Sequence, residues 1–183
     1  MMSTAPTEAE FSRIVDIAGL ADDEVRRDIT ANEREREALA RRFGLLALDR
    51  LTATVRLMRV RGGAVRVNAD FEAEVVQSCV VTLAPVPAHV TESFSVTFSA
   101  EAAHEPGEEF DLSPMAEDVA EPLVGSAIDI GETVAQYLAL ALDPYPRAPG
   151  VRFEPVTYAG PEHKVLENSP FSALASLRKR GQD

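Results

Sequence analysis

The sequence predicts an α+β fold: an antiparallel sheet or partly closed β-barrel with two packed helices and a C-terminal helical appendage. Apolar and polar residues alternate over 51–60, 64–76 and 89–99, the period of strands with one face in water. Apolar residues recur at helical spacing over 31–43 and 129–142; Thr30, which can cap a helix, precedes the first stretch, and Asp129, which can also do so, opens the second. These patterns indicate a sheet of about five strands that is covered by two helices.

The N-terminal part of the core is expected to contain a short strand and the first helix. The stretch FSRIVDIA, residues 11–18, is compatible with a strand, and the polar sequence ADDEVRRD after it indicates a link. Thr30 and Glu33 match a capping box, in which each side chain satisfies a free amide of the other residue. This box and the stop signal at Gly44 predict a helix over residues 31–43.

The strands before and after the loop RGG, residues 61–63, are expected to form a hairpin. A two-residue turn at the glycines would pair Leu57 with Asn68 and place an apolar side chain opposite a polar one. A three-residue loop with one glycine in the left-handed conformation pairs Leu57 with Val67 instead. Because paired side chains on one face should match in polarity, the second register is favoured.

The strands after the hairpin are predicted from shorter apolar runs. A third strand is expected through CVVTL, residues 79–83. Pro85 and Pro87 are expected to interrupt it before a fourth strand at 89–99. Residues 118–128 are expected to be extended.

The second helix is expected to begin in capping-box style at Asp129 and Glu132. Val134, Leu138 and Leu142 form a stripe along one side of it. This stripe predicts a well-buried helix.

The chain is expected to divide into four parts. A disordered N-terminus at 1–10 precedes an α+β core at 11–146, which includes an acidic loop at 101–117. Prolines punctuate the stretch 147–168, which predicts an extended linker. The last part, 169–183, is predicted to be an amphipathic helix with a basic end.

The negative charge of the chain is concentrated in one stretch. The formal net charge is −12, and residues 101–143 contain eleven carboxylates without one Lys or Arg. Such a stretch repels nucleic acid and attracts cations or basic proteins, although a solvated acidic loop is the simpler interpretation. The two interpretations are compatible. The candidate protein-binding carboxylates are Glu108, Glu109, Asp111, Glu117 and Asp118.

The C-terminal helix combines an apolar face with a basic tip. An isolated helix of this length is marginal in water, so the apolar face needs a surface to cover it. The surface could belong to a partner, or the helix could fold back onto the core; we expect a docking segment. The apolar candidates are Phe171, Leu174 and Leu177, and the basic candidates for RNA contact are Arg178, Lys179 and Arg180.

Arginines also cluster near the tip of the predicted hairpin. Phosphate contact requires such clustered cations. The simpler interpretation is a solvated sheet face with ion pairs to Asp70, Glu72 and Glu74. The candidate RNA-contact residues here are Arg56, Arg59, Arg61 and Arg66.

The sequence contains no recognisable catalytic, cofactor or metal-binding motif. The three histidines lie in different segments, and the single cysteine, Cys79, is expected to be a buried thiol without a metal. No apolar run reaches membrane-spanning length, and the N-terminus does not resemble a secretory signal, so a cytoplasmic protein without membrane contact is expected. Carboxylates of 108–121 could hold a divalent cation, although they lack the spacing of a binding loop.

The order of the segments resembles the YceD family (DUF177), the large ribosomal RNA subunit accumulation proteins, and in particular its alphaproteobacterial type. The resemblance covers roughly residues 10–180, and its segments are QSCVVTLAPV, IDIGETVAQYLALALDPYP and SPFSALASLRKR. Many family members carry C-x-x-C at the third strand, whereas Thr82 here takes the place of the second cysteine. A zinc site is therefore not expected in this chain.

The resemblance implies a non-enzymatic role in ribosome biogenesis. It implies a protein that supports 23S ribosomal RNA processing or accumulation and large-subunit assembly by binding an assembling component. The implied partner is a basic large-subunit ribosomal protein, the 23S ribosomal RNA precursor, or both, with no cofactor and no small-molecule substrate. Two alternatives are a metal-dependent RNA-processing hydrolase that uses carboxylates of 108–121, and direct RNA binding through the arginine hairpin.

Overall fold

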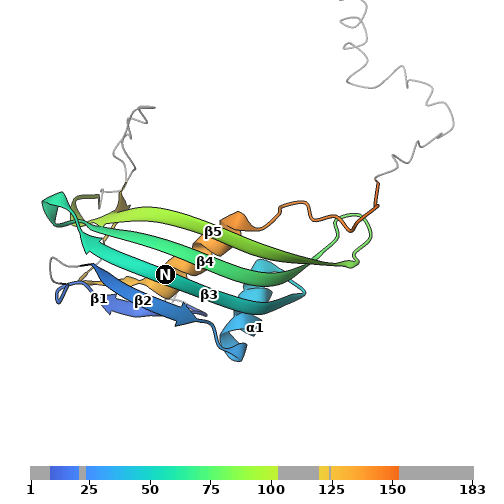
Figure 1. Ribbon diagram of the computed structural model, residues 1–183, viewed down its shortest axis with the longest axis horizontal. Coiled ribbons are helices and arrows are strands. Elements are labelled where there is room, and N and C mark those ends of the chain that lie inside the picture. Colours follow the sequence, from blue (N-terminus) through green and yellow to red (C-terminus); the bar gives the residue numbers. More distant parts are fainter. Residues whose placement is uncertain (1–8, 21–23, 103–119, 124, 153–183) are drawn as a thin grey trace, which may run out of the picture. The chain divides into compact units, whose positions relative to one another are not determined.

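Figure 1 shows the protein, a computed structural model, as a sheet with two helices on one of its sides. The structure describes residues 9–20, 24–102, 120–123 and 125–152. The elements in chain order are β1 (Ile14–Asp16), β2 (Val25–Thr30), α1 (Glu33–Phe43), β3 (Ala47–Arg59), the 3-10 turn η1 (Arg61–Gly63), β4 (Val65–Ser78), β5 (Pro85–Ser99), the 3-10 turn η2 (Ala100–Ala102), β6 (Glu121–Pro122), β7 (Ala127–Asp129) and α2 (Ile130–Ala141).

The larger sheet has the strand order β2-β3-β4-β5-β6, and β1 pairs with β7 in a separate two-stranded sheet. Strands β2 to β5 are antiparallel to their neighbours, and the short β6 runs parallel to the end of β5. The predicted α+β class is confirmed. The described part of the sheet is open and does not close into a barrel.

The hairpin of β3 and β4 has the register that the alternation predicts. Leu57 pairs with Val67 and Val55 with Ala69. In the loop, Gly62 has a φ of 78°, a left-handed conformation that glycine adopts without steric cost. Apolar side chains therefore face one another across the hairpin along its whole length.

One face of the sheet carries the core. Alternate residues of β3 and β4 are almost completely buried, because side chains along a strand point to opposite faces. Burying one such Val or Leu side chain stabilises the fold by about 1.5–3 kcal/mol. The residues of these two strands that are at most 1% exposed are Leu51, Val55, Leu57, Val65, Val67, Ala69, Ala73 and Val75.

Both helices cover this apolar face. α1 contacts β3, and α2 contacts β4 and β5, behind which it passes in Figure 1. Val134 and Leu138 of the predicted stripe are completely buried. Tyr137 stacks on Phe94 of β5, with ring centroids 3.7 Å apart and the rings 3° from parallel. The stripe therefore sets which side of α2 lies against the sheet.

A junction around Asp129 holds the start of α2 against the N-terminal segment. The Asp129 carboxylate accepts hydrogen bonds from the amides of Gly131 and Glu132, both at 3.1 Å, and caps the helix. It also accepts one from the Arg13 amide at 2.7 Å. The backbones approach so closely that a Cβ on Gly131 would lie 2.5 Å from the Phe11 carbonyl oxygen.

Two arginines connect the elements under the sheet. The Arg13 guanidinium donates to both oxygens of Glu35 on α1, at 2.7 and 3.0 Å, and lowers the pKa of that carboxyl. Arg42 of α1 donates to both oxygens of Glu132 on α2, at 2.8 and 2.7 Å, and to Glu10 at 2.9 Å. Bidentate pairs fix orientation as well as distance, so they hold α1 and α2 in one arrangement.

The predicted start of the first helix was wrong by two residues. Asn32 is the N-cap of α1, and Glu35 completes the capping box, in place of Thr30 and Glu33. Gly44 ends the helix in the left-handed conformation, as predicted. In α2, Asp129 is the cap, but the Glu132 carboxylate binds Arg42 and does not return to the cap amide.

The segment expected as a polar link contains the edge strand β2. It reaches from Val25 to Thr30 and pairs with β3, so that Arg26 lies opposite Arg56. Charged side chains are tolerated there because an edge strand is largely exposed. Ile29 is the one residue of β2 that is buried.

The expected strand at 79–83 is a turn that joins β4 to β5. The amide of Cys79 donates to the Ala84 carbonyl, and that of Leu83 to the Cys79 carbonyl, both at 2.9 Å. Pro85 and Pro87 lie within β5 and do not interrupt it. Prolines are compatible with this place because β5 pairs there with β4 alone.

No helix among the residues that the structure describes has the length and apolar character needed to cross a membrane.

The close approach at Gly131 leads to a stability prediction. We expect Gly131→Ala to lower the free energy of unfolding by about 1–3 kcal/mol, because the added methyl group meets the Phe11 backbone. The measurement is urea unfolding followed by circular dichroism. Gly19→Ala is the control, since a Cβ there has no neighbour within 4 Å, and its effect should lie between zero and a gain of about 1 kcal/mol. Equal stability of the two variants would contradict the close contact.

Candidate functional site

The face of the sheet opposite the helices is polar and open. The same alternation that buries one side chain exposes the next, so this open face consists of the polar residues of β2 to β5. Strand pairing places them in rows across the sheet. One row contains Arg26, Arg56, Asn68 and Ser95.

Arginines gather at one end of the open face, beside the loop that joins β3 to β4. Arg56 and Arg66 project from the sheet, as predicted, and Arg61 is exposed in the loop. A fourth arginine, Arg26, belongs to the same group. Sequence reasoning missed it because the strand that carries it, β2, was not predicted. This arginine end consists of Arg26, Arg56, Arg61 and Arg66.

Some of these arginines are neutralised by carboxylates. Arg56 donates to Asp70 at 2.6 Å, which is one of the ion pairs that the simpler interpretation expects. Arg26 pairs with Asp28 at 3.1 Å. The pKa of Asp28 is lowered, chiefly by the hydrogen bond from the Thr54 hydroxyl and then by that from Arg26. Within the described residues, Arg61 and Arg66 make no ion pair, so their charges are available to an anion.

Arg59 lies elsewhere. It has the parity of the buried residues of β3, and its guanidinium donates to the carbonyls of Leu20 at 3.0 Å and Ile17 at 2.5 Å. These bonds attach the segment after β1 to the sheet. The structure therefore does not bring Arg59 together with the arginine end.

A shallow hollow of about 470 Å³ lies next to the arginine end. Its polar lining comes from β3, β4 and β5. Guanidinium, amide and hydroxyl groups are those that contact the phosphates and sugars of nucleic acids. The polar residues that line it are Arg56, Asn68, Asp70, Ser93 and Ser95.

The opposite end of the sheet is apolar. The amide of Val80 donates to the Pro146 carbonyl at 2.9 Å, and the amide of Leu46 to the Val76 carbonyl at 2.8 Å, so three segments meet there. Five of the seven exposed large hydrophobic residues among those described lie at this end, between 37% and 76% exposed. This turn end consists of Leu46, Val80, Val81, Leu83 and Tyr145.

Leu83 has the most unusual backbone of the turn end. Its φ is 62°, and it is the one residue other than glycine with a positive φ in the described chain. A side chain in the left-handed region costs about 1–2 kcal/mol. The side chain is also 76% exposed, so its burial among the described residues does not offset this cost.

Cys79 opens the same turn and is buried, as predicted, although not within a strand. Its sulfur accepts a hydrogen bond from the Ala148 amide at 3.4 Å. Hydrogen bonds from the Thr82 hydroxyl and from the amides of Ala148 and Val81 lower the pKa of Cys79 to about 6. Thr82, at the position of the second cysteine of C-x-x-C, thus acts on the sulfur as a hydrogen-bond donor.

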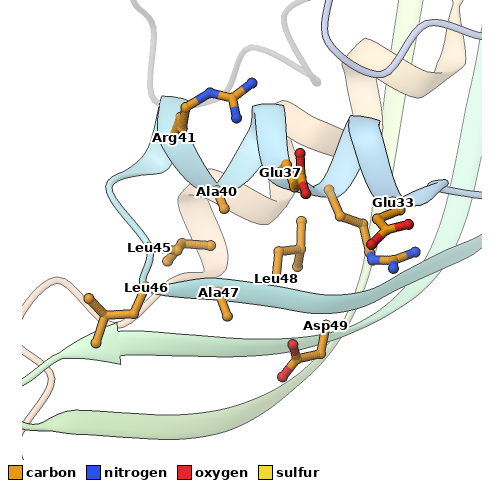
Figure 2. Close-up of a pocket in the computed structure, with 10 residues that line it drawn as sticks. Glu33, Glu37, Ala40, Arg41, Leu45, Leu46, Ala47, Leu48 and Asp49 are labelled. Atoms are coloured by element: carbon orange, nitrogen blue, oxygen red, sulfur yellow. The ribbon is translucent and has the colours of Figure 1, made fainter.

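A groove of about 380 Å³ separates α1 from the start of β3 (Figure 2). Figure 2 shows Ala40 of α1 facing Leu45 and Leu48 across it, while Leu46 points away from the helix. Glu37 lines the groove at the helix. The groove has a mixed lining, with apolar side chains inside and charged groups at its borders.

The other predicted site residues lie outside the described residues. They are the carboxylates Glu108, Glu109, Asp111, Glu117 and Asp118, the apolar residues Phe171, Leu174 and Leu177, and the basic residues Arg178, Lys179 and Arg180. The described residues contain no group of three His, Cys, Asp or Glu side chains that could hold a metal ion.

The fold and this geometry define an α+β protein with an open polar sheet face, an arginine end and an apolar turn end. The chain belongs to the family of the large ribosomal RNA subunit accumulation protein YceD, whose family model matches residues 67–178. This range is more than half of the 183 residues. Searches among curated proteins and among solved structures gave no match.

The hydrogen bonds to Cys79 lead to a pH prediction. Its pKa is about 6 in the folded protein and near 9.0 ordinarily, so between these values the unfolded chain binds more protons. Stability should therefore rise with pH from 6 to 9 and be lost as the pH falls through 6. We expect Cys79→Ala to remove this rise, measured by urea unfolding at several pH values. A parallel rise in both proteins would contradict a thiolate in the fold.

Proposed function

We propose that this protein supports the accumulation of large-subunit ribosomal RNA by binding an assembling component of the subunit, without a catalytic step of its own. Membership of the YceD family supports the role in ribosomal RNA accumulation. A cytoplasmic location follows from such a role, because the component to be bound is an assembling ribosome.

We propose further that the arginine end contacts the ribosomal RNA precursor. The observation that carries this proposal is the pair Arg61 and Arg66, which are exposed and form no ion pair with a described residue. Donors of Asn68, Ser93 and Ser95 extend the polar surface next to them. Such a surface would bind the phosphate backbone without reading the sequence.

The acidic stretch supports a second partner. Its carboxylates, from Glu108 to Asp118, would repel RNA and attract a basic ribosomal protein. Such binding would weaken as salt rises, because exposed charges are screened. RNA contact and protein contact would then involve different parts of the chain.

The RNA contact can be tested with Arg66→Ser. We expect weaker cosedimentation of the full-length protein with purified large-subunit precursor particles. The salt dependence should also change: the slope of log affinity against log salt should become shallower by about 1, the change for one lost phosphate contact.

Arg34→Ser is the matched control, because this substitution removes the same charge. Arg34 is exposed on α1, which is distant in sequence from the hairpin. Equal slopes for the two variants would refute the RNA contact. The level of 23S ribosomal RNA in cells that carry each variant as the sole copy tests the broader role.

A further inference from the structure

We propose that the turn end is the docking surface for a basic protein segment that carries apolar side chains. This inference rests on the proposed function, since it assigns a place to a protein component of the large subunit. Three features of the turn end support it: the exposed apolar side chains, the fixed shape of the turn and the charges around it.

The exposed apolar residues of the turn end lie on segments that hydrogen bonds hold together. Val80 is joined to Pro146 by a backbone hydrogen bond, and Tyr145 is the neighbour of that proline. Gln77 donates to the Asp143 carbonyl at 2.9 Å, which attaches the same segment to the end of β4. Exposed apolar residues gathered on adjoining segments, rather than scattered singly, are typical of interaction sites.

The turn has a fixed shape before any partner binds. Two backbone hydrogen bonds of 2.9 Å close it between Cys79, Leu83 and Ala84, and the Cys79 sulfur holds the amide of Ala148. The left-handed backbone at Leu83 completes the closure and leaves this side chain in water. A fixed binding surface loses little conformational entropy on association.

Leucine at position 83 is not the residue that the backbone conformation of the turn favours. Glycine or asparagine would adopt the left-handed conformation with less strain. An exposed leucine gains nothing from its own fold at this place. A partner that buries the Leu83 side chain would explain why a leucine occupies this position.

The surrounding charges indicate the chemistry of the partner. Four carboxylates lie on the segments that carry or adjoin the apolar residues, and none of them forms an ion pair with a described residue. Three exposed guanidinium groups, of Arg41, Arg50 and Arg147, lie on the same segments, and Arg50 is paired with Glu72 at 3.9 Å. The carboxylates are Glu37 and Asp49 at the groove, Glu74 beside His89, and Asp143 next to Tyr145.

This balance favours cations in the partner. Phosphates would meet apolar side chains and an excess of carboxylates, so RNA fits this end poorly. In a symmetric pair of copies the carboxylates would face one another, which disfavours a second copy of this chain. A segment of Lys or Arg around apolar residues matches both properties of the surface.

The contact can be tested by photocrosslinking with the full-length protein. Leu83→p-benzoylphenylalanine is irradiated with purified large-subunit ribosomal proteins freed of RNA, and separately with a protein-free 23S ribosomal RNA transcript. Ile14→p-benzoylphenylalanine is the matched control, since Ile14 is 72% exposed on β1 and outside the turn end. We expect position 83 alone to crosslink to a basic ribosomal protein, identified by mass spectrometry, and this crosslink to weaken at high salt.

A second variant separates binding from folding. Leu83→Asn keeps a residue that tolerates a positive φ, so its melting temperature should equal or exceed that of the wild type. Its dissociation constant for the crosslinked protein should rise about tenfold or more, because a leucine-sized apolar contact is lost. Ile14→Asn should bind like the wild type.

Several results would overturn the proposal. They are a crosslink from position 83 to RNA or to a second copy, a crosslink no stronger than that from position 14, or unchanged affinity of Leu83→Asn. If any of these results occurs while Arg66→Ser still weakens binding to the precursor, only the proposal that the turn end is a docking surface is refuted. If the wild type binds neither ribosomal proteins nor precursor particles, the proposed function fails as well.

Discussion

The hydrogen bonds to the Asp129 carboxylate are the interaction on which the packing of α2 and the N-terminal segment depends. This carboxylate accepts three amide hydrogen bonds, from Arg13, Gly131 and Glu132, at 2.7 to 3.1 Å. One side chain thus starts α2 and joins it to the segment that leads into β1. Because the Gly131 and Phe11 backbones approach so closely, any side chain larger than hydrogen at position 131 would strain this arrangement.

With both helices held under one face, the other face of the sheet stays open to solvent. β4 has 14 residues, so the loop before it and the turn after it are about 45 Å apart. Arginines lie at the first end and apolar residues at the second. The two ends of the sheet therefore present surfaces of different chemistry that are too far apart to compete for one partner group.

Strict alternation made the β3–β4 hairpin predictable down to its register, because a shift of one residue would pair Leu57 with Asn68 and place the apolar residues of one strand on the polar face. Other elements were decided by contacts that a sequence does not reveal. Two overlapping capping boxes precede α1, and the Arg13 guanidinium on Glu35 favours the second. The run after Cys79 is apolar enough for a strand, but hydrogen bonds to Ala84 and Pro146 make it a turn.

The candidate site was predictable only where it follows the strand period. Arg56 and Arg66 have the parity of the open face, whereas Arg59 has the parity of the core and lies with it. Leu83 could not be recognised, since only its backbone angle distinguishes it from an ordinary surface leucine. Local rules are usually broken where function requires it. A strained, exposed leucine at the end of a well-packed sheet is such a break, and it is the observation from which the docking proposal starts.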